Sequence, residues 1–267
     1  MEPELLATLR TKRPLVVNYA NFVTPGFVAN GLNALGASPI MTSAPEEADA
    51  LMRVADALVI NLGTINAADQ PLVTALATAA AAHHRPIVLD PVAAGATAYR
   101  LGSAKRLLAD FPITVIRGNA SEVAALIGAA ATAKGIDAGT LSDEPAALAA
   151  TCAAQYHCVT VISGAVDHIS DGSASAAVYN ETPLLPAVVG SGDLLSSLIG
   201  AYLGTTTDPF DAAVTACATL GVTGERAASD LTPLQPGTFA TRLLDGLAQL
   251  DPIDLHTSTR YEEARHA

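Results

Sequence analysis

Short runs of aliphatic and β-branched residues recur along the chain and alternate with longer Ala-rich segments. Five such runs begin at Pro14, Ala57, Pro86, Ile113 and Cys158. Because successive positions in them are apolar, each run is typical of a strand buried on both faces of a parallel sheet. The segments between them, such as 71–83 and 144–155, have helical patterning. The chain is therefore predicted to be an α/β protein, a three-layer α/β/α domain with a mostly parallel central sheet.

The pattern changes after Gly164. The stretch "DHISDGSASAAVYN" alternates around the turn at 170–173 and predicts an antiparallel hairpin, and so a mixed sheet edge. Apolar positions at helical spacing predict later helices over about 193–203, 209–228 and 238–250. A short amphipathic helix is expected at the N-terminus, and the polar tail "STRYEEARHA" is expected to fray or to form a last exposed helix. No repeat or linker interrupts the chain, so residues 1–267 are expected to form a single domain.

Charge and cysteine content narrow the function classes. The net charge of −12 over 267 residues leaves no basic stripe for a phosphate backbone, so nucleic acid is not an expected partner. No signal peptide and no uninterrupted apolar stretch of about 18 residues is present, which argues against a membrane span and for a cytoplasmic location. Cys152, Cys158 and Cys217 lack metal-site spacing and are expected to be reduced thiols in or near the core.

Polar residues follow the predicted strands at the points where they end. In an open parallel sheet, ligands bind beyond these carboxyl ends. Any one of the polar groups could merely form a turn or a helix cap, but all of them together indicate a binding site. The polar groups are at 18–21, 61–64, Asp90, 117–119 and Ser163.

The stretch "RGNASEVAAL" combines three chemically useful groups. Arg117 and Asn119 lie at a strand end, and Glu122 falls in the first turn of the following helix. Asn119 and Glu122 offer oxygen ligands for a hydrated Mg²⁺, and Arg117 could bind a phosphate. As structure alone, Glu122 would complement the helix dipole, and Asn119 or residues 120–121 would cap the helix.

The stretch "VVGSGDLLSSLIGAYLG" places Asp193 after two glycines and at the start of an apolar helical pattern. Free amides at such a helix start bind phosphate, or the charge that develops while a phosphoryl group is transferred. The alternative is that Asp193 is only an N-cap after a flexible turn. The P-loop, the dinucleotide-binding glycine motif and the protein-kinase signatures are all absent. A phosphate site here would therefore use backbone amides, one arginine and a metal.

Six motifs in this order resemble hydroxyethylthiazole kinase, a family of the ribokinase-like superfamily. The resemblance extends over about residues 18–207 and is far more specific than the short G-x-G-D motif alone. It implies a ribokinase-like fold. The motifs are "FVANGLNALGASPIM" (27–41), "INLGT" (60–64), "IVLDPVAAGAT" (87–97), "IRGNASEV" (116–123), "KGIDAG" (134–139) and "VVGSGDLLSSLIGA" (188–201).

The resemblance implies ATP-dependent phosphorylation of the hydroxyl of 4-methyl-5-(2-hydroxyethyl)thiazole, a thiamine salvage step. It also implies dependence on Mg²⁺ and a homotrimer with the thiazole site between subunits. The same resemblance assigns roles to individual residues. The thiazole would be contacted by Met41, Asn21 and Gly190, and ATP would be bound by Arg117, Ser163 and Asn119. The metal would be organised by Asp90 and Glu122. An anion hole would be formed by Gly190 to Gly192, with Asp193 as the base.

The chain departs from the family pattern at several positions. Many relatives have Cys in place of Asp193. The stretch Ser-Gly-Ala-Val-Asp at 163–167 corresponds to Thr-Gly-Glu-Val-Asp in the family, so it keeps a hydroxyl at Ser163 but loses the glutamate carboxylate at Ala165. Val189 replaces Thr, Ala93 replaces Gly, and Phe22 and Gly26 replace asparagines near the thiazole. We therefore expect a more apolar alcohol pocket that accepts a wider range of small aromatic alcohols.

Two alternative functions remain open from the sequence. One is an ADP- or ATP-dependent dehydratase of hydrated nicotinamide nucleotides, a lyase that shares the fold and the G-x-G-D loop but lacks the ASPxM and IRGNxSE motifs. The other is a non-catalytic protein that binds a nucleotide or a thiazole. Analysis of the products formed from ATP and the thiazole alcohol would separate all three functions.

Overall fold

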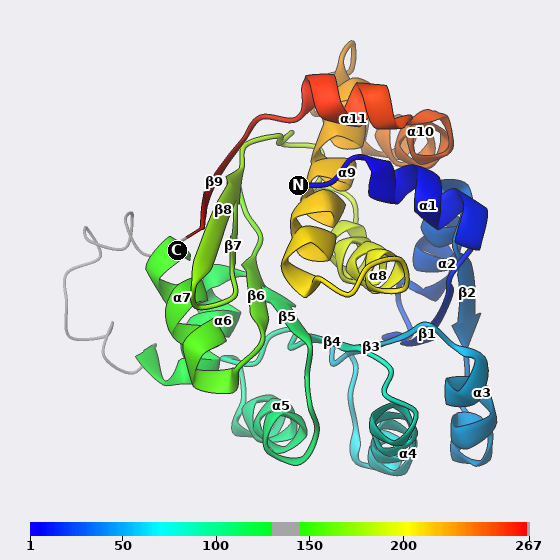
Figure 1. The fold of residues 1–267 in the computed structure, drawn as a ribbon, viewed down its shortest axis with the longest axis vertical. Helices are drawn as coiled ribbons and strands as arrows, with labels where there is room; N and C mark the ends of the chain where they lie inside the picture. The colour runs from blue at the N-terminus through cyan, green and yellow to red at the C-terminus, as the bar shows by residue number, and fades with distance from the viewer. Residues whose placement is uncertain (130–144, 266–267) are drawn as a thin grey trace.

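The computed structural model describes residues 1–129 and 145–265, and its strands form one mixed sheet (Figure 1). The strand order is β2-β1-β3-β4-β5-β6-β7-β8-β9. Neighbouring strands pair in parallel from β2 to β6 and antiparallel from β6 to β9, which confirms the predicted mixed edge. The strands are β1 (Leu15–Tyr19), β2 (Ser38–Met41), β3 (Ala57–Asn61), β4 (Ile87–Asp90), β5 (Val115–Gly118), β6 (Val159–Ile162), β7 (Asp167–Ser170), β8 (Ala174–Val178) and β9 (Tyr261–Arg265).

Helices cover both faces of this sheet, and two apolar cores result. The helices on one face are α3 (Ala48–Val54), α4 (Gln70–Ala82), α5 (Ala98–Asp110), α6 (Ala120–Ile127) and α7 (Pro145–Tyr156). Those on the other face are α1 (Glu4–Lys12), α2 (Pro25–Leu35), α8 (Ser191–Leu203), α9 (Pro209–Ala228), α10 (Pro236–Gln249) and α11 (Pro252–Ser258). The three-layer α/β/α architecture predicted from the sequence is therefore confirmed.

Burial explains why the sequence patterns forecast these strands. Every residue of β3 and β4 is buried, as expected for parallel strands between two helical layers. In β8, buried and half-buried residues alternate, as in an antiparallel strand with one packed face. The apolar run and the alternating run thus correspond to the centre and the edge of one sheet.

Helix α8 lies against the centre of the sheet, and its residues 194–203 are all buried. A Cβ on Gly200 would lie 2.8 Å from Cγ2 of Val59, so the glycine lets the helix approach β3 directly. This close packing fixes the start of α8 at the carboxyl edge of the sheet, where β3 and β4 also end.

The structure corrects two expectations about element boundaries. Residues 261–265 form the strand β9, paired with β8, rather than a frayed tail or a helix, because β8 would otherwise leave its backbone groups unpaired. Helix α8 begins at Ser191, two residues before the expected start, so Asp193 lies within its first turn. The pattern also left β2 and α11 unpredicted, because both are short.

Other expectations are confirmed or fall outside the described residues. All three cysteines are buried and free. The amphipathic N-terminal helix is α1, and the hairpin is β7–β8. Among the described residues, no helix is both long and apolar enough to cross a bilayer. The motif at 134–139 lies outside the described residues.

Candidate functional site

The carboxyl ends of the parallel strands and the start of α8 meet at one edge of the sheet. Asn61 and Asp90 are the last residues of β3 and β4, and Asn21 follows β1 by two residues. All three side chains are buried. Hydrogen bonds join each of them to Asp193 or to one another, so the polar strand ends do form one cluster.

Asp193 is the centre of this cluster. Its Oδ2 accepts hydrogen bonds from Nδ2 of Asn21 at 2.7 Å and from Oγ1 of Thr24 at 2.5 Å. Its Oδ1 accepts from Nδ2 of Asn61 at 2.9 Å. Three neutral donors therefore fix the orientation of the carboxylate.

The structure rules out Asp193 as an N-cap. The N-cap of α8 is Gly190, whose φ of 97° lies in the left-handed region, and Asp193 is the third residue of the helix. No side chain among the described residues caps this end, so the first amides of α8 have no side-chain acceptor. The interpretation of Asp193 as a cap after a flexible turn is wrong.

Asp90 shares a donor with Asp193. Nδ2 of Asn61 donates to Asp90 Oδ2 at 3.1 Å as well as to Asp193, and Ser196 Oγ donates to the same Oδ2 at 2.7 Å. Burial raises the pKa of Asp90 to about 7, although Arg117 and Ser196 favour the ionised form. Asn61 thus connects two carboxylates that differ in their environments.

A metal ion at Asp90 is compatible with these contacts. Asp90 Oδ1 is buried and has no hydrogen-bond partner in the described part of the chain. A magnesium ion keeps several waters and needs only one or two protein carboxylates, so an orphaned oxygen of this kind fits it. Within the described ranges, no group of three or more His, Cys, Asp or Glu side chains could hold a metal. Substrate phosphates and water would therefore have to supply the remaining ligands.

Glu122 and Asn119 are occupied with each other. The Asn119 side chain accepts from the Glu122 N–H at 2.9 Å, while Glu122 Oε2 accepts from the Asn119 N–H at 2.8 Å, a capping box at the start of α6. Glu122 Oε1 accepts from the N–H of Ala93 at 2.7 Å. Ala93 adopts a φ of 56°, in the left-handed region that favours glycine. Glu122 therefore shapes the loop after β4.

Arg117 lies between the strand ends and the start of α8. Its guanidinium donates to Ser163 Oγ and, at 3.4 Å, to Asp90 Oδ2. A Cβ on Gly192 would lie 2.6 Å from Nη1 of Arg117. Gly192 is therefore needed for the guanidinium to reach the first turn of α8.

A cavity of about 490 Å³, which we name the Arg117 cavity, opens beside this group. It extends from the loop after β6 to the segment after β8 and to α9. Its lining includes Arg117, Asn119, Ser163, Ser191 and Gly192 at one end, and Asn180 to Thr182, Leu185, Leu220 and Gly221 at the other.

A second cavity, of about 230 Å³, contains Met41 and is named the Met41 cavity. Asn18, Phe22, Thr64 and Asp69 also line it. Asn21 is not among its lining residues, because the Asn21 side chain points to Asp193 and Asn61. Met41 and Asn21 are both expected to contact the thiazole, but Met41 lines the Met41 cavity, whereas the Asn21 side chain belongs to the hydrogen-bonded cluster around Asp193.

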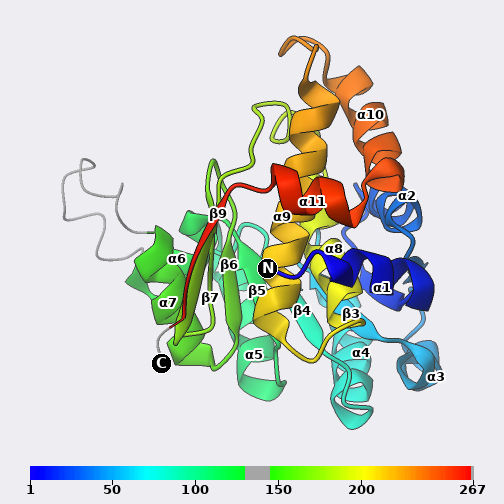
Figure 2. The same cartoon turned by 45° about the horizontal axis from the view of Figure 1, so that its top comes forward.

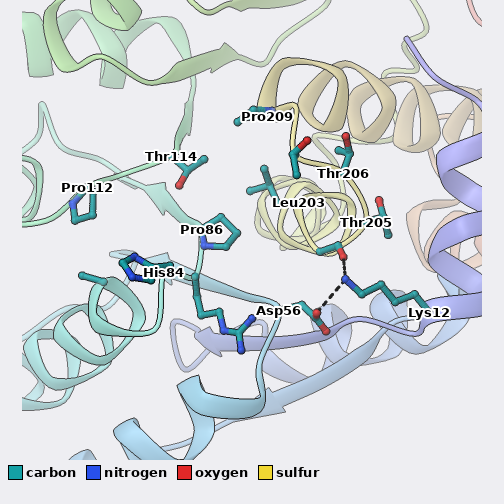
Figure 3. A pocket seen from close by; sticks show the side chains of 14 residues that line it. Lys12, Asp56, His84, Pro86, Pro112, Thr114, Leu203, Thr205, Thr206 and Pro209 are labelled. Atoms are coloured by element: carbon teal, nitrogen blue, oxygen red, sulfur yellow. Dashed lines mark hydrogen bonds and ion pairs between the residues drawn. The ribbon is translucent and has the colours of Figure 1, made fainter.

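A cavity of about 570 Å³ lies at the opposite edge of the sheet (Figure 3). Asp56, Pro86 and Thr114, which line it, come just before β3, β4 and β5. Its cations are occupied: Lys12 contacts Asp56 and the carbonyl of Gly204, and Arg85 donates to the carbonyls of residues 52 and 53. We assign no chemistry to this cavity.

The sequence patterns do not reveal Thr24 or Ser196 as members of the cluster, and they give Asn61 no chemical role. Asn61 was recognised only as one of the polar strand ends. Thr24 precedes α2, and Ser196 lies in α8 between apolar residues and Ser197, three residues after Asp193. That spacing places Ser196 on the same side of α8 as Asp193, and was the one available signal.

Comparisons with known proteins agree with this geometry. The sequence model of the Hydroxyethylthiazole kinase family matches residues 6–252. A hydroxyethylthiazole kinase of Pediococcus pentosaceus is 47% identical over 260 residues, covering 97% of this chain and 98% of that protein. The one from Lactiplantibacillus plantarum is 46% identical, covering 98% and 100%.

Solved structures show the same likeness. The structure of the hydroxyethylthiazole kinase protein from Pyrococcus horikoshii OT3 superposes with a TM-score of 0.90 at 35% identity, with 98% of each chain covered. The pyridoxal kinase of Bacillus subtilis, at 15% identity and a TM-score of 0.59 over 79% of this chain and 91% of the other, shares the fold. The fold is ribokinase-like, and the chain belongs to the hydroxyethylthiazole kinase family.

Proposed function

We propose that this protein phosphorylates the hydroxyl of 4-methyl-5-(2-hydroxyethyl)thiazole with ATP, as a thiamine salvage enzyme. The observation that carries the proposal is the position of Asp193. Its carboxylate lies in the first turn of α8, beside uncapped helix amides and an arginine, in a chain with the full-length family match. Neither the lyase nor the non-catalytic alternative is favoured by that match.

In this mechanism the alcohol oxygen attacks the γ-phosphorus of ATP, the bond from that phosphorus to the β,γ-bridging oxygen breaks, and ADP leaves. Asp193 accepts the hydroxyl proton as the new bond forms. The donors from Asn21, Thr24 and Asn61 hold the carboxylate in a fixed orientation. Because phosphoryl transfer has a loose transition state, proton loss can come late, and a carboxylate is basic enough to accept it.

The charge of the transferring group is stabilised by Arg117 and by the amides of 190–192. Each donor of this kind contributes on the order of 3 kcal/mol to the transition state. Ser163 holds the guanidinium, and Asn119 lies at the same end of the Arg117 cavity. Asp90 would hold Mg²⁺, with Glu122 supporting the loop beside it. The ion would neutralise charge on the phosphates.

We assign the Arg117 cavity to ATP and the Met41 cavity to the alcohol. Phe22 and Val23, which lie between Asn21 and Thr24 in the sequence, are 81% and 60% exposed. Val189, which precedes Gly190, is 73% exposed. These apolar side chains favour an assembly in which other subunits cover the alcohol site, and we propose a homotrimer in the cytoplasm, each chain forming one domain. Phe22 lines the Met41 cavity beside polar residues such as Asn18 and Thr64, whereas Gly26 and Val189 are not among its lining residues, so the wider acceptance of small aromatic alcohols that we propose rests on Phe22.

Product analysis tests the proposed function. Incubation of the protein with ATP, Mg²⁺ and the thiazole alcohol should yield ADP and the thiazole phosphate in equal amounts. Dehydration of a hydrated nicotinamide nucleotide with ADP would establish the lyase instead. Binding of either ligand without turnover would establish the non-catalytic alternative.

A further inference from the structure

The segment that follows β8 forms one wall of the Arg117 cavity. Asn180, Glu181, Thr182, Leu185 and Pro186 all line the cavity. Ser191 Oγ donates to the Leu185 carbonyl at 2.8 Å, so the end of the segment reaches the first residue of α8, whereas the side-chain hydrogen bonds to the Asp193 carboxylate come from Asn21, Thr24 and Asn61. The position of the segment determines the shape of the end of the cavity that is remote from Arg117.

Asn180 is held by parts of the chain that are distant in sequence. Its Nδ2 donates to Glu225 Oε2 at 2.7 Å and to the carbonyl of Ser258 at 3.0 Å. Its Oδ1 accepts from the N–H of Arg260 at 2.7 Å, and the Glu181 N–H donates to Glu225 Oε1 at 3.0 Å. The wall is therefore attached both to α9 and to the segment before β9.

Arg260 closes this network. Its Nη1 and Nη2 donate to Oε2 and Oε1 of Glu225 at 3.0 and 2.6 Å, the bidentate geometry that suits a guanidinium and a carboxylate. Its Nη2 also donates to the Tyr179 carbonyl at 2.9 Å. Burial opposes ionisation of Glu225, but Arg260, Asn180 and the Glu181 N–H outweigh it and hold the pKa of Glu225 below its ordinary value.

Helix α9 limits the wall from the other side. A Cβ on Gly221 would lie 2.5 Å from the Asn180 carbonyl oxygen and 2.8 Å from its Cβ. The backbone of the helix thus touches the wall directly, one turn before Glu225. Figure 2 shows β9 alongside β8. The Tyr179 N–H donates to the Arg260 carbonyl at 2.8 Å, so Arg260 lies just before these paired strands and next to the wall.

We propose that Arg260 and Glu225 are positioning residues for the nucleotide: together they hold the wall at Asn180–Pro186 at the spacing that ATP requires. The proposal rests on the assignment of the Arg117 cavity to ATP. Neither side chain lines that cavity, so both act through Asn180 and Glu181. Loss of the pair should weaken nucleotide binding and leave the alcohol site and the chemical step intact.

Arg260→Ala, Arg260→Lys and Glu225→Gln test this role, with Arg265→Ala as the matched control. Arg265 lies on β9 itself, but pairs with Glu263 and Asp211 rather than with Glu225. Steady-state kinetics would give the KM for ATP, the KM for the alcohol and kcat. Calorimetry would give the affinity for ADP without any alcohol present.

Arg260→Ala should raise the KM for ATP and the Kd for ADP about two- to fivefold, the upper part of the range for loss of a partly exposed ion pair. The KM for the alcohol and kcat should stay within about twofold. Glu225→Gln should act in the same direction, Arg260→Lys should recover part of the affinity, and Arg265→Ala should match the parent.

Equal ADP affinity in the parent and Arg260→Ala would overturn the positioning role and leave the proposed function standing. An equal loss in Arg265→Ala would also overturn it, because general loosening of β9 would then explain the effect. If the parent binds no nucleotide, both proposals are wrong.

Discussion

Asp193 receives hydrogen bonds from Nδ2 of Asn21 and Nδ2 of Asn61, which can only donate, and from the Thr24 hydroxyl, which can donate or accept. An amide at this position would direct its own NH₂ at one of those donors. Replacement of the carboxylate therefore changes the local hydrogen bonding as well as the chemistry.

We predict that Asp193→Asn lowers kcat by about 10² to 10⁴, because the base is lost, while the KM for ATP stays nearly constant. Stability should fall by about 1 kcal/mol, since one hydrogen bond of the cluster is lost. Steady-state kinetics and urea unfolding measure these effects. Arg117→Ala provides the contrast: it should weaken ATP binding as well as turnover, because the phosphate contact exists in both the ground and transition states. Turnover of Asp193→Asn within about twofold of the parent would place the chemistry elsewhere.

Asp167 makes stability depend on pH. Burial raises its pKa from 3.8 to about 6, against the opposing effects of the Gly164 N–H and Arg117. The folded protein thus retains a proton that the unfolded chain releases between about pH 4 and 6, so this group lowers stability as pH rises through that window.

We therefore predict that Asp167→Asn gains stability over the parent as pH rises from about 4 to 6, reaching about 3 kcal/mol at pH 7, because a pKa difference of about two units corresponds to about that free energy. An asparagine Oδ1 can still accept from the Gly164 N–H, which donates to Asp167 at 3.0 Å. Urea unfolding of both proteins at several pH values measures the difference. A difference that is constant with pH contradicts the assignment.

At the scale of elements, the start of α8 combines two glycines with different physical requirements. Gly190 needs its positive φ of 97°, and a Cβ there would lie 2.9 Å from Thr24 Cγ2. Gly192 has an ordinary helical conformation, but its Cβ would meet the Arg117 guanidinium. Gly190 is therefore needed for its backbone conformation, and Gly192 is needed because a side chain there would collide with the Arg117 guanidinium.

We predict that Gly190→Ala lowers stability by about 1–2 kcal/mol because the left-handed conformation disfavours a Cβ. Gly192→Ala should leave stability within about 1 kcal/mol, since alanine suits a helix, yet lower kcat/KM for ATP at least tenfold by displacing Arg117. Thermal unfolding and kinetics on both variants check this difference. A normal kcat/KM in Gly192→Ala would show that Arg117 adapts freely.

At the scale of the whole molecule, the exposed apolar residues beside the cluster predict assembly. Phe22 is 81% exposed, and Leu234, in the loop between α9 and α10, is 90% exposed. Light scattering of the parent should give three times the 27.1 kDa chain mass. Phe22→Glu should shift the protein toward monomers and reduce activity, whereas the control Leu234→Glu should not. A parent that scatters only as a 27.1 kDa species would remove the support for a shared site.

The sequence by itself determined the layered fold and the chemical groups at its carboxyl edge. The apolar run 57–61, the turn at 170–173 and the helical pattern after Asp193 were legible because burial and turn formation depend on neighbouring residues. The ordered motifs then identified the family. Even so, the local pattern could not distinguish Asp193 as a helix cap from Asp193 as the acceptor of three hydrogen bonds from distant side chains.

Only the tertiary structure decided which groups meet. Asn61 reaches Asp193 across 132 positions of sequence, and Arg260 reaches Glu225 across 35. The strand β9 exists because β8 offers an open edge, although its own residues are polar and exposed. These contacts depend on the path of the chain through space, and residues far apart in sequence leave no periodic signal that would reveal them.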